Sequence, residues 1–248
     1  MENSGEKTEH IVSSYDDDLK QLSSMLLRMG GLAESQLAAA IQAVTRRDSE
    51  LAQKVIDTDQ QIDDLDDEVN AFCTRLLALR QPMAVDLRNI VAALKLSGDI
   101  ERVGDYAKNV AKRAIALNQA PMVAPVHNVP RIGGLVQRMI KDVLDAYAER
   151  DVARAIDVWN RDEEVDELYN SLFRELLTYM MEDPRNITSC THLLFIAKNI
   201  ERMGDHTTNM AENIHYVIEG KRLHDSRPKS DDTSTFAGPS ENVRKLET

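Results

Sequence analysis

Apolar residues recur along most of the chain at alternating steps of four and three residues. One such stripe follows Asp48 and runs through Leu51, Val55, Thr58, Ile62, Leu65, Val69, Phe72, Leu76 and Leu79, of which only Thr58 is polar. Two more stripes run through Ile100, Val103, Ala107, Val110 and Ala114, and through Ile196, Ile200, Met203, Met210, Ile214 and Val217. This spacing predicts long amphipathic helices that bury one face in a bundle.

The chain also contains an internal repeat. The tripeptide GGL occurs at Gly30–Leu32 and at Gly133–Leu135, which are 103 residues apart. The phrases DIERVGDYAKN (Asp99–Asn109) and NIERMGDHTTN (Asn199–Asn209) are 100 residues apart. Because a change of three residues in one loop explains both offsets, the sequence predicts two homologous halves.

Each half divides into three helices. Asp48 and Asp151 suit N-cap positions, and Pro82 and Pro184 mark the far ends of the helices that these residues begin. The predicted fold is therefore all-α, with two homologous antiparallel three-helix bundles in tandem, related by a pseudo-twofold axis. The expected units are a flexible N-terminal segment 1–14, a first bundle 15–118, a proline-rich linker 119–130, a second bundle 131–222 and a disordered tail 223–248.

Composition narrows the possible partners and location. The 248 residues include 30 Lys and Arg against 42 Asp and Glu, a net charge of −12, which argues against nucleic-acid binding. No long uncharged apolar run is present, so we expect a cytoplasmic protein without direct membrane insertion. Cys73 and Cys190 stand alone and are expected to be reduced thiols packed in the helices.

The repeated phrase places acidic residues in a column on each third helix. Glu101, Asp105 and Asn109 lie at i, i+4 and i+8, and so do Glu201, Asp205 and Asn209. A helical wheel puts this column opposite the apolar stripe. Carboxylates at i and i+4 repel each other, and a glycine in mid-helix costs about 1 kcal/mol relative to alanine. Finding both features twice suggests that something outside the helix offsets them.

The second helix of each half carries a matching acidic pair. These pairs are Asp59 with Asp63 and Asp162 with Asp166, and an antiparallel neighbour would bring each pair near the acidic column. About four carboxylates per half suit hard cations, because oxygen ligands select such metals over softer ones. Three interpretations stay open: metal sites, an unoccupied acidic docking face, and a solvated surface.

Other chemistry-bearing residues favour structural roles. His206 is expected on the surface, Trp159 at a bundle edge, and Arg102 and Arg202 in ion pairs with carboxylates of neighbouring helices. No phosphate-binding loop, GxSxG or HExxH motif occurs, and no nucleophile adjoins a base, so we expect no enzymatic activity.

Two stretches resemble the phosphate-uptake regulator family, PhoU. They are RQPMAVDLRNIVAALKLSGDIERVGDYAKNVAKR (Arg80–Arg113) and NIERMGDHTTNMAENIHYVIEG (Asn199–Gly220), and the likeness spans roughly residues 15–222. The resemblance implies tandem three-helix bundles and a cytoplasmic homodimer. It also implies negative regulation of the phosphate-starvation response, as an adaptor between the ATPase subunit of an ABC phosphate transporter and a sensor histidine kinase.

The resemblance further implies metal-binding motifs of the Glu/Asp-x-x-x-Asp type. Carried onto this chain, they fall on Asp59, Asp63, Glu101, Asp105, Asp162, Asp166, Glu201 and Asp205, with Asn109 and Asn209 as possible additional ligands. The metals would be divalent or ferric ions such as Mg, Mn, Fe or Zn, with no organic cofactor. Gly98-Asp99 against Lys198-Asn199 departs from the repeat and predicts unequal sites. Metal-dependent phosphate-ester chemistry and metal storage are the alternative functions.

Overall fold

The protein is described by a computed structural model, which covers residues 5–80, 82–83 and 85–223, with residues 5–16 and 80 described by their backbone only. Its long helices are α1 (Gly5–Arg46), α4 (Val85–Asn118), α5 (Val129–Glu149) and α8 (Ile187–Glu219). Its shorter helices are α2 (Ser49–Thr58), α3 (Gln60–Arg80), α6 (Val152–Asn160) and α7 (Asp162–Glu182), with 3₁₀ turns η1 (Ala124–Asn128) and η2 (Pro184–Asn186).

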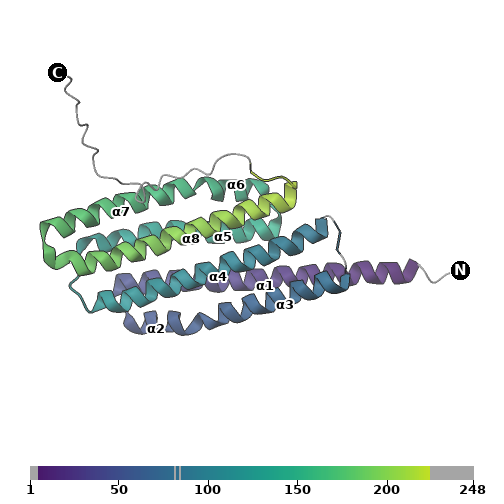
Figure 1. Ribbon diagram of the computed structural model, residues 1–248, viewed down its shortest axis with the longest axis horizontal. Helices are drawn as coiled ribbons and strands as arrows, with labels where there is room; N and C mark the ends of the chain where they lie inside the picture. The colour runs from purple at the N-terminus through teal and green to yellow at the C-terminus, as the bar shows by residue number, and fades with distance from the viewer. Residues whose placement is uncertain (1–4, 81, 84, 224–248) are drawn as a thin grey trace, which may run out of the picture.

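These helices form two bundles that lie side by side along their lengths (Figure 1). The first bundle packs α1, α2 with α3, and α4 together, and the second packs α5, α6 with α7, and α8. Helix α4 packs against α8, and α1 packs against α5, so these four helices join the two bundles. The predicted all-α tandem of three-helix bundles is confirmed.

The second helix of each half is interrupted, which the sequence analysis did not predict. Helix α2 ends at Thr58 and α3 begins at Gln60, while α6 ends at Asn160 and α7 begins at Asp162. At the first break the Ile62 amide donates to the Asp59 carbonyl, a bond of 2.8 Å that tightens the turn to 3₁₀ spacing. The break contains no proline or glycine, and the apolar stripe continues through it, so the pattern suggested one continuous helix.

The two predicted N-caps are confirmed. The Asp48 carboxylate accepts a hydrogen bond of 2.9 Å from the Leu51 amide, and Asp151 accepts one of 3.0 Å from the Arg154 amide. The arginine before each cap adopts a left-handed conformation, with φ of 56° at Arg47 and 55° at Arg150. The two halves therefore use the same turn between their first and second helices.

The ends of the first bundle differ from the expected boundaries. Helix α1 begins at Gly5 rather than near Tyr15, because residues 5–14 lack the apolar pattern from which a helix start is inferred. The linker region contains η1, and Pro130 lies in the first turn of α5, where a missing amide hydrogen costs nothing. The tail expected to be disordered, apart from its first residue, lies outside the described residues.

Contacts between repeat-related residues show the pseudo-twofold relation of the two bundles. Leu144 lies over Gly30, and Ile41 lies over Gly133; an added Cβ would come within 2.4 Å and 2.2 Å of these side chains. Because Gly30 corresponds to Gly133 and Ile41 to Leu144 at the same offset of 103 residues, the two contacts mirror each other. The GGL repeat therefore marks two close contacts between α1 and α5.

The bundle interiors are apolar, and both cysteines belong to them. Cys73 and Cys190 are buried, and burial raises the pKa of the Cys73 thiol to about 11, which keeps it protonated and unreactive at neutral pH. Trp159 is only 6% exposed and donates a hydrogen bond of 3.0 Å to Glu212 Oε1, so it is more deeply buried than a bundle-edge position predicts. Among the described helices, none has the length and apolar character that crossing a membrane requires.

Candidate functional site

The first acidic cluster consists of Asp59, Asp63, Glu101 and Asp105, at the junction of α2, α3 and α4. Asp59 occupies the break between α2 and α3, where it is only 2% exposed. Helix α4 supplies Glu101 and Asp105, whose side chains are 23% and 33% exposed. The structure thus brings the predicted pair on the second helix to the predicted column on the third.

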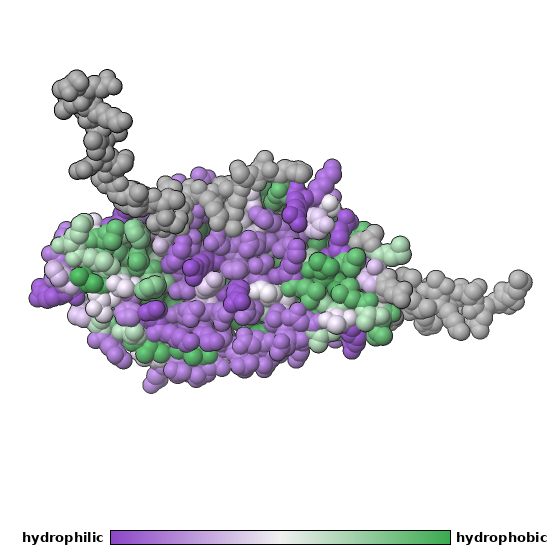
Figure 2. Space-filling view, viewed as in Figure 1, coloured by the Kyte–Doolittle hydropathy of each residue, from purple (hydrophilic) through white to green (hydrophobic). Residues whose placement is uncertain are grey.

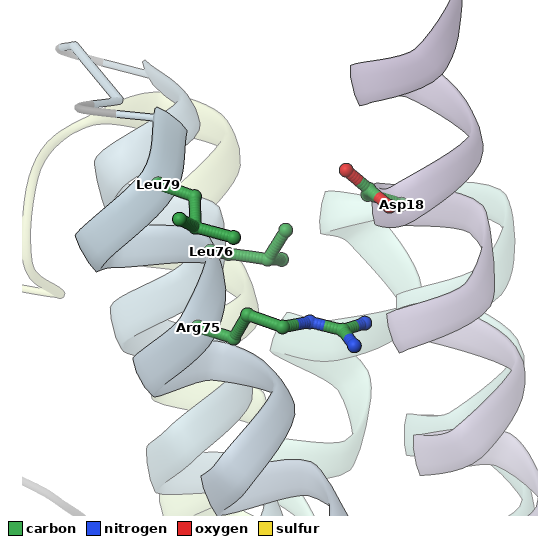
Figure 3. A pocket seen from close by; sticks show the side chains of 4 residues that line it. All are labelled: Asp18, Arg75, Leu76 and Leu79. Atoms are coloured by element: carbon green, nitrogen blue, oxygen red, sulfur yellow. The ribbon is translucent and has the colours of Figure 1, made fainter.

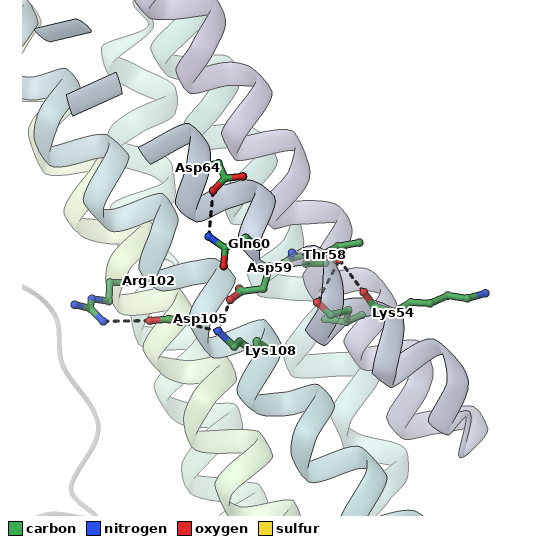
Figure 4. A network of polar contacts seen from close by, with 10 residues as sticks. Lys54, Thr58, Asp59, Gln60, Asp64, Arg102, Asp105 and Lys108 are labelled. Atoms are coloured by element: carbon green, nitrogen blue, oxygen red, sulfur yellow. Dashed lines mark hydrogen bonds and ion pairs between the residues drawn. The ribbon is translucent and has the colours of Figure 1, made fainter. Parts of the chain in front are cut away.

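A lysine lies inside this cluster. The Lys108 ammonium donates a short hydrogen bond to Asp59 Oδ2, and Asp105 Oδ1 lies 3.8 Å from its Nζ (Figure 4). Hydrogen bonding to Asp59 is the main reason that the pKa of Lys108 is raised. Lys108 therefore acts as the internal counter-charge of the first acidic cluster, a role that the sequence did not reveal because Thr208, and not a lysine, stands at its repeat position.

Arg102 forms ion pairs on the solvent-exposed side of the first acidic cluster. Its Nε lies 3.4 Å from Glu101 Oε2, and its Nη1 lies 3.2 Å from Asp105 Oδ2. The predicted ion pairing of Arg102 is confirmed, although its partners lie on its own helix and not on a neighbouring one. With its side chain 56% exposed, Arg102 contributes little to stability through these pairs.

Two carboxylates of the cluster, those of Glu101 and Asp63, hold protons more tightly than free carboxylates do. Burial, followed by repulsion from Asp105, raises the pKa of Glu101 to about 6. Burial, followed by repulsion from Asp59, also raises the pKa of Asp63. At Asp63, burial and carboxylate repulsion outweigh the attraction of Lys108, which lowers the pKa.

The second acidic cluster consists of Asp162, Asp166, Glu201 and Asp205, at the junction of α6, α7 and α8. Asp162, Asp166 and Glu201 are 2%, 4% and 4% exposed, so this cluster is more deeply buried than the first. Lys198 Nζ lies 2.9 Å from Glu201 Oε1, and Thr208 Oγ1 donates a hydrogen bond of 3.2 Å to Asp162 Oδ1.

The two clusters place their lysines differently. Thr208 stands at the repeat position of Lys108, and both side chains contact the aspartate at the helix break. Lys198 stands at the repeat position of Gly98, which has no side chain. Each cluster therefore contains a lysine, but the two lysines occupy repeat positions ten residues apart on the third helix, or about three turns, so the two sites are unequal in structure.

The helical wheel was wrong about the direction of the acidic column. Glu201 is buried, Glu101 and Asp105 are partly buried, and only Asn109 is exposed. Helix α4 contacts α1, α2, α3 and α8, so the Glu101 and Asp105 part of its polar column is partly covered by neighbouring helices and does not face solvent fully. The wheel located the apolar stripe but did not show that neighbours also cover the opposite side.

The glycines of the repeated phrase let the broken helix approach the third helix. A Cβ on Gly104 would lie 2.8 Å from Ile62 Cδ1 and 3.6 Å from Asp59 Oδ1. A Cβ on Gly204 would lie 3.3 Å from Val165 Cγ1. The close approach at these glycines is thus made by aliphatic side chains next to the acidic clusters.

The predicted metal sites have the type of donor atom that a hard cation needs, but their side chains are not arranged to hold a metal ion. Carboxylate oxygens are the ligands that hard cations prefer. Across the described ranges, however, no three His, Cys, Asp or Glu side chains are arranged to hold a metal ion, and lysine ammonium groups approach the acidic residues. Metal binding by the eight carboxylates stays a prediction.

The remaining predictions for single residues are partly corrected. His206, expected at the surface, lies between the bundles: its Nδ1 is 2.9 Å from Asp99 Oδ1, and its ring centroid is 5.7 Å from that of Tyr106. Arg202, expected in an ion pair, instead lies over the Tyr106 ring at 5.8 Å. Tyr106 and His206 are repeat partners, so their contact places the pseudo-twofold axis between α4 and α8.

The family model named PhoU domain matches the chain twice, at residues 26–114 and 129–214. The chain belongs to the PhoU family. The two PhoU matches coincide with the two bundles, and each contains one acidic cluster. The internal repeat inferred from the sequence is therefore confirmed as two PhoU domains.

Relatives and solved structures agree with this assignment. The chain is 58% identical over 225 residues to the "Phosphate-specific transport system accessory protein PhoU homolog" of Caulobacter vibrioides, covering 90% of this chain and 98% of that protein. It is 48% identical over 228 residues to the homologue of the same name from Rhizobium meliloti, covering 92% and 96%. The crystal structure of PhoU from Pseudomonas aeruginosa superposes with a TM-score of 0.80 at 41% identity, covering 84% of this chain and all of that one.

Proposed function

We propose that this PhoU-family protein is a negative regulator of high-affinity phosphate uptake and of the phosphate-starvation response. It acts in the cytoplasm as a homodimeric adaptor between the ATPase subunit of an ABC phosphate transporter and a sensor histidine kinase. The observation that carries the proposal is family membership over both bundles, together with relatives named as accessory proteins of phosphate-specific transport. Binding, not catalysis, is the proposed mode of action.

Exposed apolar side chains at opposite ends of the molecule support an adaptor role. The α3–α4 end carries Leu79, Met83, Val85, Leu87 and Val91, which are 39–80% exposed, and the α7–α8 end carries Leu177, Met181 and Ile187, which are 38–77% exposed. Figure 2 shows hydrophobic colour gathered at these two ends, separated by a hydrophilic middle. Exposed apolar patches rimmed by polar residues typically mark protein-binding surfaces.

The α3–α4 end is also hollowed. Asp18 of α1 and Arg75, Leu76 and Leu79 of α3 line an open pocket of about 410 Å³ (Figure 3). The apolar wall from α3 suits an apolar side chain inserted by a partner protein. The charged groups at the mouth of the pocket suit polar residues next to that side chain. By contrast, the acidic clusters are occupied by internal ion pairs, so we assign docking to the apolar ends instead of the acidic faces.

A pull-down tests the adaptor proposal. Immobilised wild-type protein is expected to retain the transporter ATPase and the sensor kinase, more strongly at high phosphate than at low. Met83→Asp with Leu87→Asp disrupts one end, and Met181→Asp with Ile187→Asp disrupts the other. Lys54→Asp, at an exposed residue of α2 outside both ends, makes the same change of two charges and is the matched control. Equal retention of both partners by all variants would refute docking through the ends.

Two alternative functions depend on metal in the acidic clusters. Metal-dependent phosphate-ester chemistry predicts turnover of phosphate esters by the metal-loaded protein, and metal storage predicts many ions per chain. Lys108 and Lys198 contact the clusters as internal cations, so neither alternative is favoured. Elemental analysis and an esterase assay on the purified protein distinguish both from the adaptor.

A further inference from the structure

A basic pocket lies between the bundles, away from both acidic clusters. Asn109, Lys112, Arg113 and Ala116 of α4 line it from one side, and Phe195, Asn199 and Arg202 of α8 line it from the other. The pocket is open and has a volume of about 430 Å³, within the range of about 300–1,000 Å³ typical of small-molecule sites.

The positive charge of this pocket is unusual for a chain with a net charge of −12. Residues 106–118 of α4 and 187–200 of α8 contain no Asp or Glu. Within the described part of the chain, no carboxylate forms an ion pair with Lys112, Arg113 or Arg202. Three cationic groups thus line the pocket without a protein counter-charge, and a ligand anion would provide one.

Aromatic rings hold two of these cationic groups in place. The Arg113 guanidinium lies 4.4 Å from the centroid of the Phe195 ring, and the Arg202 guanidinium lies 5.8 Å from that of Tyr106. Stacking on a ring orients a guanidinium and leaves its N–H groups available to an oxyanion. Burial, followed by the charge of Arg113, also lowers the pKa of nearby His192.

The internal repeat provides a comparison within the same molecule. The repeat partners of Lys112 and Asn199 are Glu212 and Asp99, both carboxylates, and each is already engaged: Glu212 by Trp159 and Asp99 by His206. The repeat partner of Arg202 is Arg102, which is paired with Glu101 and Asp105. The second copy of this surface therefore has carboxylates in place of Lys112 and Asn199, and its arginine is already paired, so it does not repeat the cluster of cations without a counter-charge.

We propose that the basic pocket binds the phosphate group of a small molecule, as either free inorganic phosphate or a polyphosphorylated compound. Arginine recognises phosphate through paired N–H donors, and Lys112 adds a point charge. Three cations and a volume of this size favour a ligand with more than one phosphate group. Because the pocket spans both bundles, such a ligand links the two halves of the chain. Binding is measured on the isolated protein, so the proposal does not depend on the adaptor function.

Calorimetric titration of the purified full chain tests this proposal. The probes are inorganic phosphate, tripolyphosphate and ATP at matched ionic strength, which distinguish free phosphate from polyphosphorylated ligands. Lys112→Glu installs the residue found in the second repeat and is expected to weaken binding at least tenfold. Lys54→Glu makes the same charge change at an exposed lysine of α2 and is the matched control, with an expected change below twofold.

Further variants separate the pocket from general electrostatic attraction. Arg202→Gln is expected to weaken binding about tenfold, whereas Arg102→Gln, at its repeat partner, leaves binding within twofold. Saturable binding of any one probe that is lost in Lys112→Glu and Arg202→Gln supports the proposal and identifies the ligand class. Absence of saturable binding by all three probes, or equal loss in the control variants, would overturn it.

Discussion

Removing Lys108 perturbs the first acidic cluster most directly. In Lys108→Met the aliphatic part of the side chain stays, but Asp59, which is 2% exposed, loses its cationic partner. Removing one partner of a fully buried ion pair costs about 3–5 kcal/mol. Because the Lys108 side chain is 27% exposed, we expect a smaller loss of about 2 kcal/mol in the free energy of unfolding at pH 7. This corresponds to a fall in Tm of about 4–8 °C.

Urea denaturation of matched variants measures this loss. Lys112→Met, one turn later on the same helix and exposed, is the control and is expected to change the free energy of unfolding by less than about 0.5 kcal/mol. Adding Asp59→Asn to Lys108→Met removes the unpaired charge and is expected to restore most of the stability. Mn²⁺ is expected to stabilise Lys108→Met more than the wild type, because the lysine no longer competes for the carboxylates. A Lys108→Met protein as stable as the wild type would refute the role of Lys108 as counter-charge.

Further predictions concern pH, packing and metal content. Because burial and Asp105 raise the pKa of Glu101 to about 6, the folded state gains stability from protonating Glu101 that is fully present below about pH 4.5 and lost as the pH rises through 6. Glu101→Gln should therefore raise the free energy of unfolding by about 1–2 kcal/mol at pH 8 and by much less at pH 4.5; equal effects at both pH values would contradict this. Gly98→Ala meets no atom within 4 Å and should stabilise by about 0.5–1 kcal/mol in thermal unfolding, whereas Gly104→Ala pushes a Cβ within 2.8 Å of the fully buried Ile62 and should destabilise by about 1–2 kcal/mol. A stabilising Gly104→Ala would disprove the close approach at this glycine. If the clusters bind metal, Glu101→Ala with Asp105→Ala should remove the metal of the first bundle only, as measured by elemental analysis; undiminished metal content would contradict the ligand assignment.

Much of the fold was predictable because local signals and the repeat agree. Asp48 and Asp151 cap helices as expected, and the GGL repeat marks a real close contact between α1 and α5. The breaks at Asp59 and Arg161 were not predictable, because neither proline nor glycine marks them and the apolar stripe passes through both. Their consequence is large, since the first break lets Asp59 reach α4.

The acidic clusters were predictable in membership but not in environment. The spacing predicted that Asp59 and Asp63 lie near Glu101 and Asp105, and Lys108, which contacts both Asp59 and Asp105, joins the two pairs in the structure. The buried position of the clusters and the role of Lys108 depend on which helices cover α4, and a single-helix wheel contains no such information. The basic pocket was missed for the same reason, because its lysine and arginines come from two helices that are about 90 residues apart in sequence.

The most direct test of the proposed regulatory function is a reporter of the phosphate-starvation response in cells grown at high phosphate. We predict that removing this protein from the cells raises reporter output to the level seen in phosphate starvation. Wild-type protein and Lys54→Asp should restore repression, and Met83→Asp with Leu87→Asp should not. Reporter output that stays low after deletion would contradict the proposal that this PhoU-family protein represses the response.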